Sequence, residues 1–368
     1  MAQAPLLLDH PRPFSVMNES LHPGRFLIIG IHGKHLDSKM LSFLSEVQPN
    51  GICLFSRNIE SISQLKQLTS DISEALANPP FFAIDHEGGR VDRLRRIVEP
   101  SPAASSIKTK ESAATFGRAV GNLLASFGIS LNFAPVVDIN LTDSISNGLA
   151  TRCFSSRLEE VVELAGEFLN SMEAAGVAGC VKHFPGLGRS VTDSHDSLPI
   201  VSESKETLLA EDLAAFTPFI NRDITAIMTG HATYPSLVER NESGRTLPAS
   251  ICRQLVSGTL REQMGHSGIV VTDDLEMGAL KEFGSISEIV LASLCAGNDQ
   301  ALVCNDPENV RQALDGVNSW LSSAEPSDVA QGKNRIDRWR TKIEAVNFED
   351  KLEMGEIEES LRGLKPGE

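Results

Sequence analysis

The chain is poor in positive charge. It carries 33 lysines and arginines against 49 aspartates and glutamates, which gives a formal net charge of −16 over 368 residues. A surface of that sign repels phosphate backbones and anionic membranes. We therefore expect neither a nucleic acid nor a membrane among its partners.

Long apolar segments are also lacking. No stretch approaches the roughly 20 apolar residues that a membrane span requires. The N-terminus has no basic segment followed by an apolar core, because three prolines, Asp9 and His10 closely bracket the short run Leu6–Leu8. We expect residues 1–24 to form an N-terminal leader to the folded domain.

The six cysteines are scattered and include no CxxC pair. Three of them, Cys53, Cys180 and Cys304, lie in apolar runs, where a free cysteine behaves as a small hydrophobic residue. This usage indicates free thiols in a reducing compartment, and we expect a cytoplasmic protein.

The chain is rich in short apolar runs separated by segments of helix length. The runs span residues 26–31, 51–55, 81–85, 131–138, 177–183, 224–228, 268–273 and 301–304, and helices are expected at 62–77, 112–127, 158–175, 250–264, 310–321 and 334–346. Runs that are apolar throughout are typical of strands buried on both faces of a parallel sheet. Eight such units predict an α/β fold, a single-domain (β/α)8 TIM-type barrel, with a doubly wound open sheet as the alternative.

Polar residues gather at the predicted carboxyl ends of these strands, where barrel enzymes keep their active sites. The ends in question are residues 85–93, Asp138, residues 182–183, His231 and residues 273–274. A single aspartate at a strand end is often a helix N-cap, and a single histidine often has a structural role. Five strand ends that meet on one face indicate an enzyme.

The most informative segment begins with Lys182-His183-Phe184-Pro185-Gly186-Leu187-Gly188 and ends with Asp193-Ser194-His195. A histidine near its natural pKa can both give and take a proton at neutral pH. Asp193 can accept a hydrogen bond from His195 and fix the tautomer of the ring. The structural alternative is an Asx-turn with a solvated histidine. Gly186 and Gly188 would let this loop close over a substrate.

Six motifs resemble glycoside hydrolase family 3, and within it the single-domain β-N-acetylglucosaminidases (β-hexosaminidases) of the NagZ type. In chain order they are Asp85-x-Glu87-Gly88-Gly89-Arg90-Val91-x-Arg93, Phe133-Ala134-Pro135-Val136-Val137-Asp138, Arg152-x-Phe154-Ser155, Lys182-His183-Phe184-Pro185-Gly186-x-Gly188, Asp193-Ser194-His195 and Thr272-Asp273-Asp274-Leu275-x-Met277. The resemblance runs from about Phe26 to Asn305. It implies a catalytic domain, which we place at residues 25–348, followed by an acidic C-terminal tail at 349–368.

The resemblance implies a retaining exo-β-N-acetylglucosaminidase that releases GlcNAc from peptidoglycan turnover fragments, without metal or cofactor. Such hydrolysis requires a carboxylate nucleophile and a proton donor on opposite faces of the anomeric carbon. By resemblance, Asp273 is the nucleophile and Asp193 with His195 forms the acid/base dyad. Asp274 should face away from the sugar, because neighbouring strand residues point to opposite sides. The sugar-holding residues implied are Asp85, Arg93, Arg152, Lys182 and His183.

The sequence departs from the NagZ type at Leu187, where histidine is common, and at His86, where glutamine is common. These changes leave open a β-glycosidase of other aglycone specificity. A GlcNAc phosphorylase is a further alternative, because a histidine donor carries no negative charge to repel phosphate. Further alternatives are a lysine-dependent aldolase acting through Lys182, a catalytically silent sugar-binding barrel and a metal site at residues 85–87.

Two further features have structural interpretations. Glu87 and Arg90 can form an ion pair that shapes their loop. His231 is expected to line the wall of the site. The sequence leaves the oligomeric state open.

Overall fold

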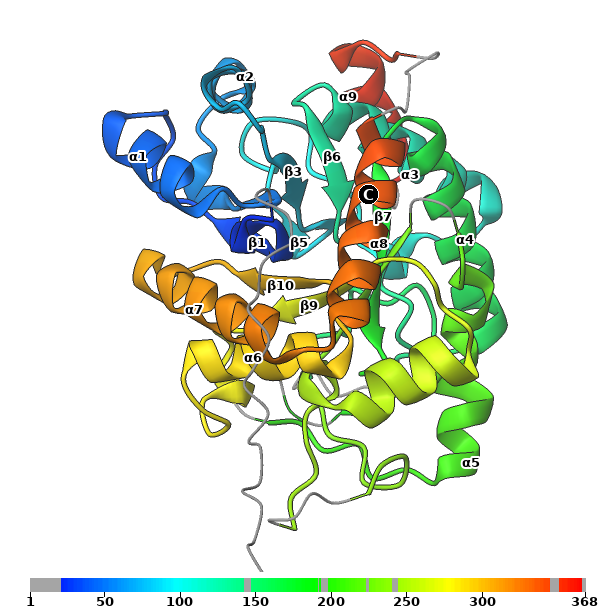
Figure 1. Cartoon of the computed structure of the whole chain (residues 1–368). Helices are drawn as coiled ribbons and strands as arrows, with labels where there is room; N and C mark the ends of the chain where they lie inside the picture. Colours follow the sequence, from blue (N-terminus) through cyan, green and yellow to red (C-terminus); the bar gives the residue numbers. More distant parts are fainter. Residues whose placement is uncertain are drawn as a thin grey trace, which may run out of the picture.

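The eight short apolar runs form one closed parallel barrel (Figure 1). The computed structural model describes residues 21–141, 147–190, 192, 198–222, 225–239, 244–344 and 351–365. The barrel strands are β1 (Leu27–Gly30), β2 (Gly51–Leu54), β3 (Phe81–Ile84), β6 (Ile129–Asn132), β7 (Ala178–Phe184), β8 (Ala226–Thr229), β9 (Val270–Asp274) and β10 (Gln300–Val303). Their order around the barrel, β1-β10-β9-β8-β7-β6-β3-β2, confirms the predicted TIM-type fold and rejects the open sheet.

Helices surround this barrel. They are α1 (Ser38–Val47), α2 (Ile62–Ala75), α3 (Lys110–Ala125), α4 (Leu158–Ala174), α5 (Lys205–Thr207), α6 (Ile286–Ala296), α7 (Pro307–Ser323), α8 (Pro326–Glu344) and α9 (Met354–Gly363). A short hairpin, β4 (His86–Gly88) with β5 (Val91–Asp92), follows β3. No helix in the described part of the chain is long and apolar enough to span a membrane.

Two predicted elements were wrong in detail. The strand expected at 131–138 ends at Asn132, because Pro135 has no amide to donate to a ladder. The segment beyond it contacts β7 through isolated bonds, such as the one from Val137 N to Lys182 O (2.9 Å). The helix expected at 250–264 is a 3₁₀ turn (Ala249–Ile251) and a π-helix (Gln254–Gln263). In the latter, the Thr259 hydroxyl bonds Gln254 O and draws the ladder into the wider spacing.

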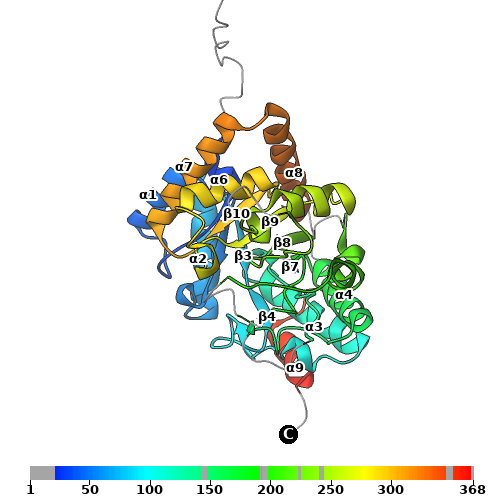
Figure 2. The same cartoon turned by 90° about the horizontal axis from the view of Figure 1, so that it is seen from below.

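Helix α8 crosses the end of the barrel where the strands begin (Figures 1 and 2). Arg335 Nε bonds Asp299 Oδ1, just before β10, at 2.7 Å. Asp337 accepts a bond of 2.8 Å from Arg25, which precedes β1. Arg340 reaches Asn50, which precedes β2. This end of the barrel is therefore closed, and the opposite end, where the strands finish, is left for a site.

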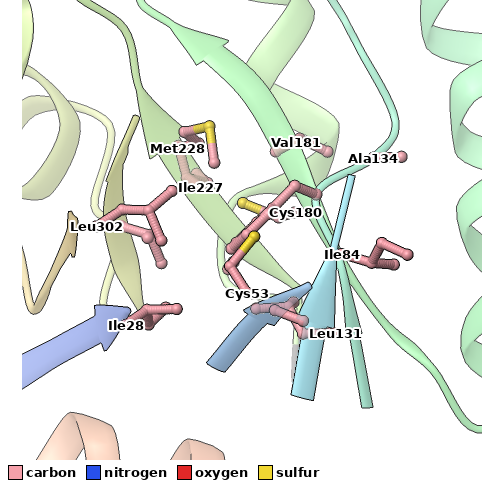
Figure 3. Packing of buried hydrophobic residues seen from close by; sticks show 14 of the residues in the cluster. Ile28, Cys53, Ile84, Leu131, Ala134, Cys180, Val181, Ile227, Met228 and Leu302 are labelled. Carbon is pink, nitrogen blue, oxygen red and sulfur yellow. The ribbon is translucent and has the colours of Figure 1, made fainter. Parts of the chain in front are cut away.

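The interior of the barrel is filled by apolar side chains. Figure 3 shows Ile28, Cys53, Cys180 and Leu302 packed between the strands, and each is at most 3% exposed. All six cysteines are unpaired, and only Cys295 is exposed. The barrel is thus a packed core rather than a pore.

Candidate active site

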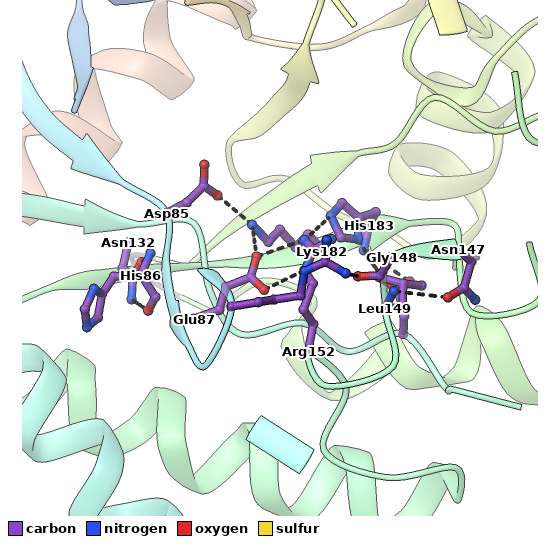
Figure 4. A network of polar contacts seen from close by, with 12 residues as sticks. Asp85, His86, Glu87, Asn132, Asn147, Gly148, Leu149, Arg152, Lys182 and His183 are labelled. Carbon is purple, nitrogen blue, oxygen red and sulfur yellow. Dashed lines mark hydrogen bonds and ion pairs between the residues drawn. The ribbon is translucent and has the colours of Figure 1, made fainter. Parts of the chain in front are cut away.

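A network of buried charges lies where β3 and β7 end (Figure 4). The Lys182 ammonium lies 2.7 Å from Asp85 Oδ1 and 2.6 Å from Glu87 Oε1. Lys182 comes from β7, whereas Asp85 directly follows β3 and Glu87 lies on β4. The closed barrel thus brings together residues almost one hundred positions apart in the chain.

Glu87 is also held by Arg152 in a bidentate pair, with Nε–Oε2 at 2.7 Å and Nη2–Oε1 at 2.9 Å. The same Nη2 lies 3.2 Å from His183 Nε2. The predicted ion pair between Glu87 and Arg90 was wrong, because Arg90 donates to Gly148 O instead. The Glu87 carboxylate is thus occupied by Arg152 and Lys182 and does not pair with Arg90.

The charges in this network stabilise one another. Burial works against ionised Glu87, but Arg152 and Lys182 together hold its pKa well below the usual range. Burial likewise disfavours the charged form of Lys182, yet Asp85 and Glu87 raise its pKa above the ordinary value. A Schiff-base lysine must become a neutral amine. This environment therefore argues against the aldolase alternative.

Asp138 fixes the orientation of His183. Its Oδ2 lies 2.6 Å from His183 Nδ1, and its Oδ1 accepts a bond of 2.7 Å from the amide of Leu187. The sequence marked Asp138 only as a strand end, so its role as the partner of His183 was missed. A signal existed, because a buried histidine ring needs a hydrogen-bond partner such as a carboxylate or carbonyl.

Asp85 and Arg93 form the accessible part of the network. Their side chains are 20% and 29% exposed, against 2% for Lys182 and 3% for Glu87. Arg93 Nη2 lies 3.6 Å from Asp85 Oδ2, and its Nε is buried without a partner among the described residues. The Arg93 guanidinium also lies over the Phe55 ring. A carboxylate and a guanidinium, both partly exposed, thus lie next to each other at the edge of the network.

Asp273 and Asp274 end β9 and have opposite environments. Burial raises the pKa of Asp273, but the positive fields of His231, His183 and Lys182 outweigh it and keep this pKa below its usual range. Asp274 instead bonds the amide of Glu276 and the Asn305 side chain, and burial raises its pKa to about 7. The neighbours of Asp273 therefore favour its charged form, whereas the oxygens of Asp274 are occupied by structural bonds.

His231 supports this end of β9 from β8. Its Nε2 lies 3.0 Å from Asp274 O, and its Nδ1 lies 2.8 Å from Ser250 Oγ. The ring is 1% exposed. Its place behind the strand, with an electrostatic effect on Asp273, agrees with the expected wall position.

Asp193 and His195 lie outside the described residues. The chain that leads to them is anchored firmly up to Ser190. Arg189 Nε bonds Asp212 Oδ2 at 2.6 Å, and Tyr234 donates to Gly186 O at 2.7 Å. Leu187, which replaces the usual histidine, is 4% exposed and so belongs to the core.

The metal alternative at residues 85–87 finds no support in the geometry. The His86 ring turns away from Lys182 and lies 2.9 Å from Ser101 Oγ (Figure 4). Its two neighbours, Asp85 and Glu87, face Lys182 instead. Within the described ranges, no three His, Cys, Asp or Glu side chains are placed to hold a metal ion.

Known proteins are similar to this chain in both sequence and fold. A β-hexosaminidase from Idiomarina loihiensis is 32% identical over 345 residues, which cover 92% of this chain and 99% of that protein. The structure of a glycoside hydrolase family 3 β-N-acetylglucosaminidase from Paenibacillus sp. str. FPU-7 has a TM-score of 0.84 at 29% identity, covering 95% of this chain and 68% of that one.

NagZ from Neisseria gonorrhoeae is similar over almost its full length. Its native structure has a TM-score of 0.78 at 29% identity, with 93% of this chain and 98% of that chain covered. Its complex with N-trifluoroacetyl-D-glucosamine gives 0.77 at 29% identity, with 92% and 97% covered. The family model for the glycosyl hydrolase family 3 N-terminal domain matches residues 28–338. The chain therefore belongs to glycosyl hydrolase family 3.

Proposed function

We propose that this glycoside hydrolase is a retaining exo-β-N-acetylglucosaminidase. The observation that carries the proposal is Asp273 at the end of β9, whose pKa is lowered by its neighbours, at the same end of the barrel as the accessible pair Asp85 and Arg93. A nucleophilic carboxylate next to groups that bind hydroxyls is what retaining glycoside hydrolysis requires. The β-hexosaminidase relatives and the Neisseria protein that binds a glucosamine derivative support GlcNAc as the sugar.

The reaction proceeds in two displacements. Asp273 attacks the anomeric carbon and forms a glycosyl ester, while the bond to the leaving oxygen breaks and His195 gives that oxygen a proton. His195 then takes a proton from water, whose oxygen attacks the same carbon and releases Asp273. Asp193 bonds the imidazole and stabilises its charged form. This sequence of steps needs neither a metal nor a cofactor.

Sugar binding divides between accessible and buried residues. Asp85 accepts hydrogen bonds from sugar hydroxyls, and Arg93 donates from the exposed part of its guanidinium. Lys182, Arg152 and His183 complete the wall, since their contacts with carboxylates already hold them in position. The cationic side chains that favour ionised Asp273 thus also help to position the sugar.

The proposed substrate is GlcNAc linked to (anhydro)muramic acid in peptidoglycan turnover fragments. We propose a cytoplasmic setting, supported by the free thiols of all six cysteines. We also propose residues 25–348 as the catalytic domain, between a leader and an acidic tail. The match of the family model to residues 28–338 lies within these limits.

The test compares nitrophenol release from the β-N-acetylglucosaminide and the β-glucoside by wild type, Asp273→Asn and Asp274→Asn. Removal of the nucleophile should lower kcat by about a thousandfold or more, whereas Asp274→Asn should retain most activity. The pair is matched, because the two carboxyls are adjacent in one strand. Equal loss in both variants would reject Asp273 as the specific nucleophile.

A second experiment tests the proton donor and the acceptor. His195→Ala should lose more activity on substrates with poor leaving groups than on nitrophenyl substrates, since a good leaving group needs less protonation. Anomeric NMR of the first product should show retained configuration. Accumulation of sugar 1-phosphate in phosphate buffer would show that the enzyme is a phosphorylase rather than a hydrolase. Absence of turnover on muropeptides as well as on nitrophenyl substrates would favour a sugar-binding protein without activity.

A further inference from the structure

A second hollow lies at the closed end of the barrel, opposite the active site. It runs between α8 and the segments that precede β8 and β9, and its larger part has a volume of about 690 Å³. The larger part is lined entirely by polar residues, namely Arg261, His266, Ser267, Gln331, Asn334, Arg335, Asp337 and Arg338. These side chains offer hydrogen-bond donors and charge to a hydrophilic ligand.

Positive charge dominates this hollow, although the chain as a whole carries −16. Its two parts share Arg335 and Arg338, and Arg222, Arg261 and Lys342 also border it. Two acidic residues lie along it: Asp337, which pairs with Arg25 and Lys333, and the buried Asp299, which pairs with Arg261 and Arg335. Arg222 pairs with Glu173, whereas Arg338 adds a further positive charge. A local excess of cations on an acidic protein favours an anion at this position.

Helix α8 presents two different faces. Val329, Ile336, Trp339 and Ile343 form its buried face. Gln331, Asn334, Arg335 and Arg338 recur at helical spacing along the hollow. Arg335 and Arg338 are one turn apart, with a rise of about 4.5 Å between them. Two guanidinium groups at that separation can bind the same phosphate group.

The floor of the hollow is rigid. Asp299 is 1% exposed and accepts from Arg335 Nε at 2.7 Å and from Arg261 Nη2 at 2.8 Å. It also accepts from the amide of Val270. Both guanidiniums are therefore held in place before any ligand binds, which lowers the entropic cost of binding.

His266 supplies an unused polar atom in the same hollow. The ring is 2% exposed, and its Nδ1 has no hydrogen-bond partner among the described residues. Burial lowers the pKa of His266 to about 4, so the ring is neutral at pH 7. With Nε2 bonded to Ile269 O, Nδ1 is left as an acceptor. A hydroxyl of a ligand can donate to it.

We propose that this hollow, lined by Arg335, Arg338 and His266, binds a phosphate monoester of a small hydroxylated molecule. The arginines take the phosphate, and the amides of Gln331 and Asn334 with His266 take the hydroxyl-bearing part. The site is independent of the hydrolytic reaction, because it lies where the strands begin rather than where they end. Its occupant need not be a substrate.

The test is isothermal titration calorimetry of the full chain with glucose 6-phosphate at fixed ionic strength. Excess N-acetylglucosamine is present throughout to occupy the hydrolytic site. Wild type should bind one equivalent, and glucose should give no measurable heat. Arg338→Glu and Asn334→Asp should each weaken binding by about tenfold or more, because both put a negative charge beside the phosphate.

The control is Lys39→Glu, which makes the same change of charge as Arg338→Glu at an exposed position on α1. It should bind as wild type does, and circular dichroism should show that all variants are folded. Absence of saturable binding to wild type overturns the proposal. So does equal binding of glucose, or an affinity that Arg338→Glu leaves unchanged.

Discussion

Glu87 is the residue on which the polar network depends. It is 3% exposed and receives bonds from both Arg152 and Lys182. Removing one partner of a buried ion pair leaves uncompensated charge in a medium that solvates it poorly. Here, loss of the carboxylate would leave two cations short of a partner, with Asp85 the remaining partner of Lys182.

We therefore expect Glu87→Gln to lower the free energy of unfolding by about 3–5 kcal/mol. Urea unfolding of the variant and the wild type measures this difference. The matched control is Glu46→Gln, which removes a bidentate partner of Arg311 at an exposed position and should cost less than about 1 kcal/mol. Similar losses in the two variants would contradict the special role of the buried pair.

Titration of Asp274 makes the stability of the protein depend on pH. Burial raises its pKa from 3.8 to about 7, and the nearby charges of Glu276 and Asp273 act in the same direction. Between about pH 4 and 7 the folded protein retains a proton that the unfolded chain has lost. This carboxyl therefore lowers stability as pH rises through that window, and its effect is constant above it.

Asp274→Asn should remove this dependence. The stability of the variant relative to wild type should rise from about pH 4 to pH 7 and then level off. Urea unfolding across the range measures it, with the exposed Asp315→Asn as the control. A difference between Asp274→Asn and wild type that stays constant with pH would exclude a raised pKa at this position.

Helices α3 and α4 approach each other closely at Gly117. A Cβ on Gly117 of α3 would lie 2.1 Å from Phe168 O, a backbone atom of α4, whereas a Cβ on Gly166 of α4 meets nothing within 4 Å. Gly117 is thus required by the close approach of two backbones. Gly166 only weakens its own helix.

The two glycines therefore predict opposite results for the same substitution. Gly117→Ala should destabilise the protein by about 1–3 kcal/mol through overpacking. Gly166→Ala should stabilise it by about 0.5–1 kcal/mol through helix propensity. Thermal or urea unfolding distinguishes them. A stabilising Gly117→Ala would mean that the helices separate more easily than their contact indicates.

Elements could be predicted where one local pattern determined them. Apolar runs gave the positions of the barrel strands, since burial on both faces requires continuous hydrophobicity. The run at 131–138 gave a wrong end for the strand, because Phe133, Val136 and Val137 are buried although they lie beyond β6. The pairing of Glu87 with Arg152 was also unpredictable locally, because it joins residues 65 positions apart through the closed barrel.

At the scale of the whole molecule, the two ends of the barrel have different roles. The strand ends carry the polar network of the candidate site, and the strand beginnings are joined by contacts with α8. The contact between Arg25 and Asp337 spans 312 positions, so no local sequence pattern could reveal it. The closed end fixes the position of the open end, since β9 begins at Val270, which bonds the buried Asp299, and ends with Asp273 and Asp274.

Asp299 is the buried centre of this closure, since it pairs with Arg261 and Arg335 and accepts from Val270 N. Asp299→Ala should lower the free energy of unfolding by about 3–5 kcal/mol, because two largely buried guanidiniums lose their counter-charge. Lys333→Ala, which breaks a more exposed pair on the same helix, should cost less than about 1 kcal/mol. Urea unfolding compares the two, and activity measured on the folded fraction separates loss of stability from loss of catalysis. If Asp299→Ala lowered the free energy of unfolding no more than Lys333→Ala, this end of the barrel would be stabilised by the apolar face of α8 rather than by its ion pairs.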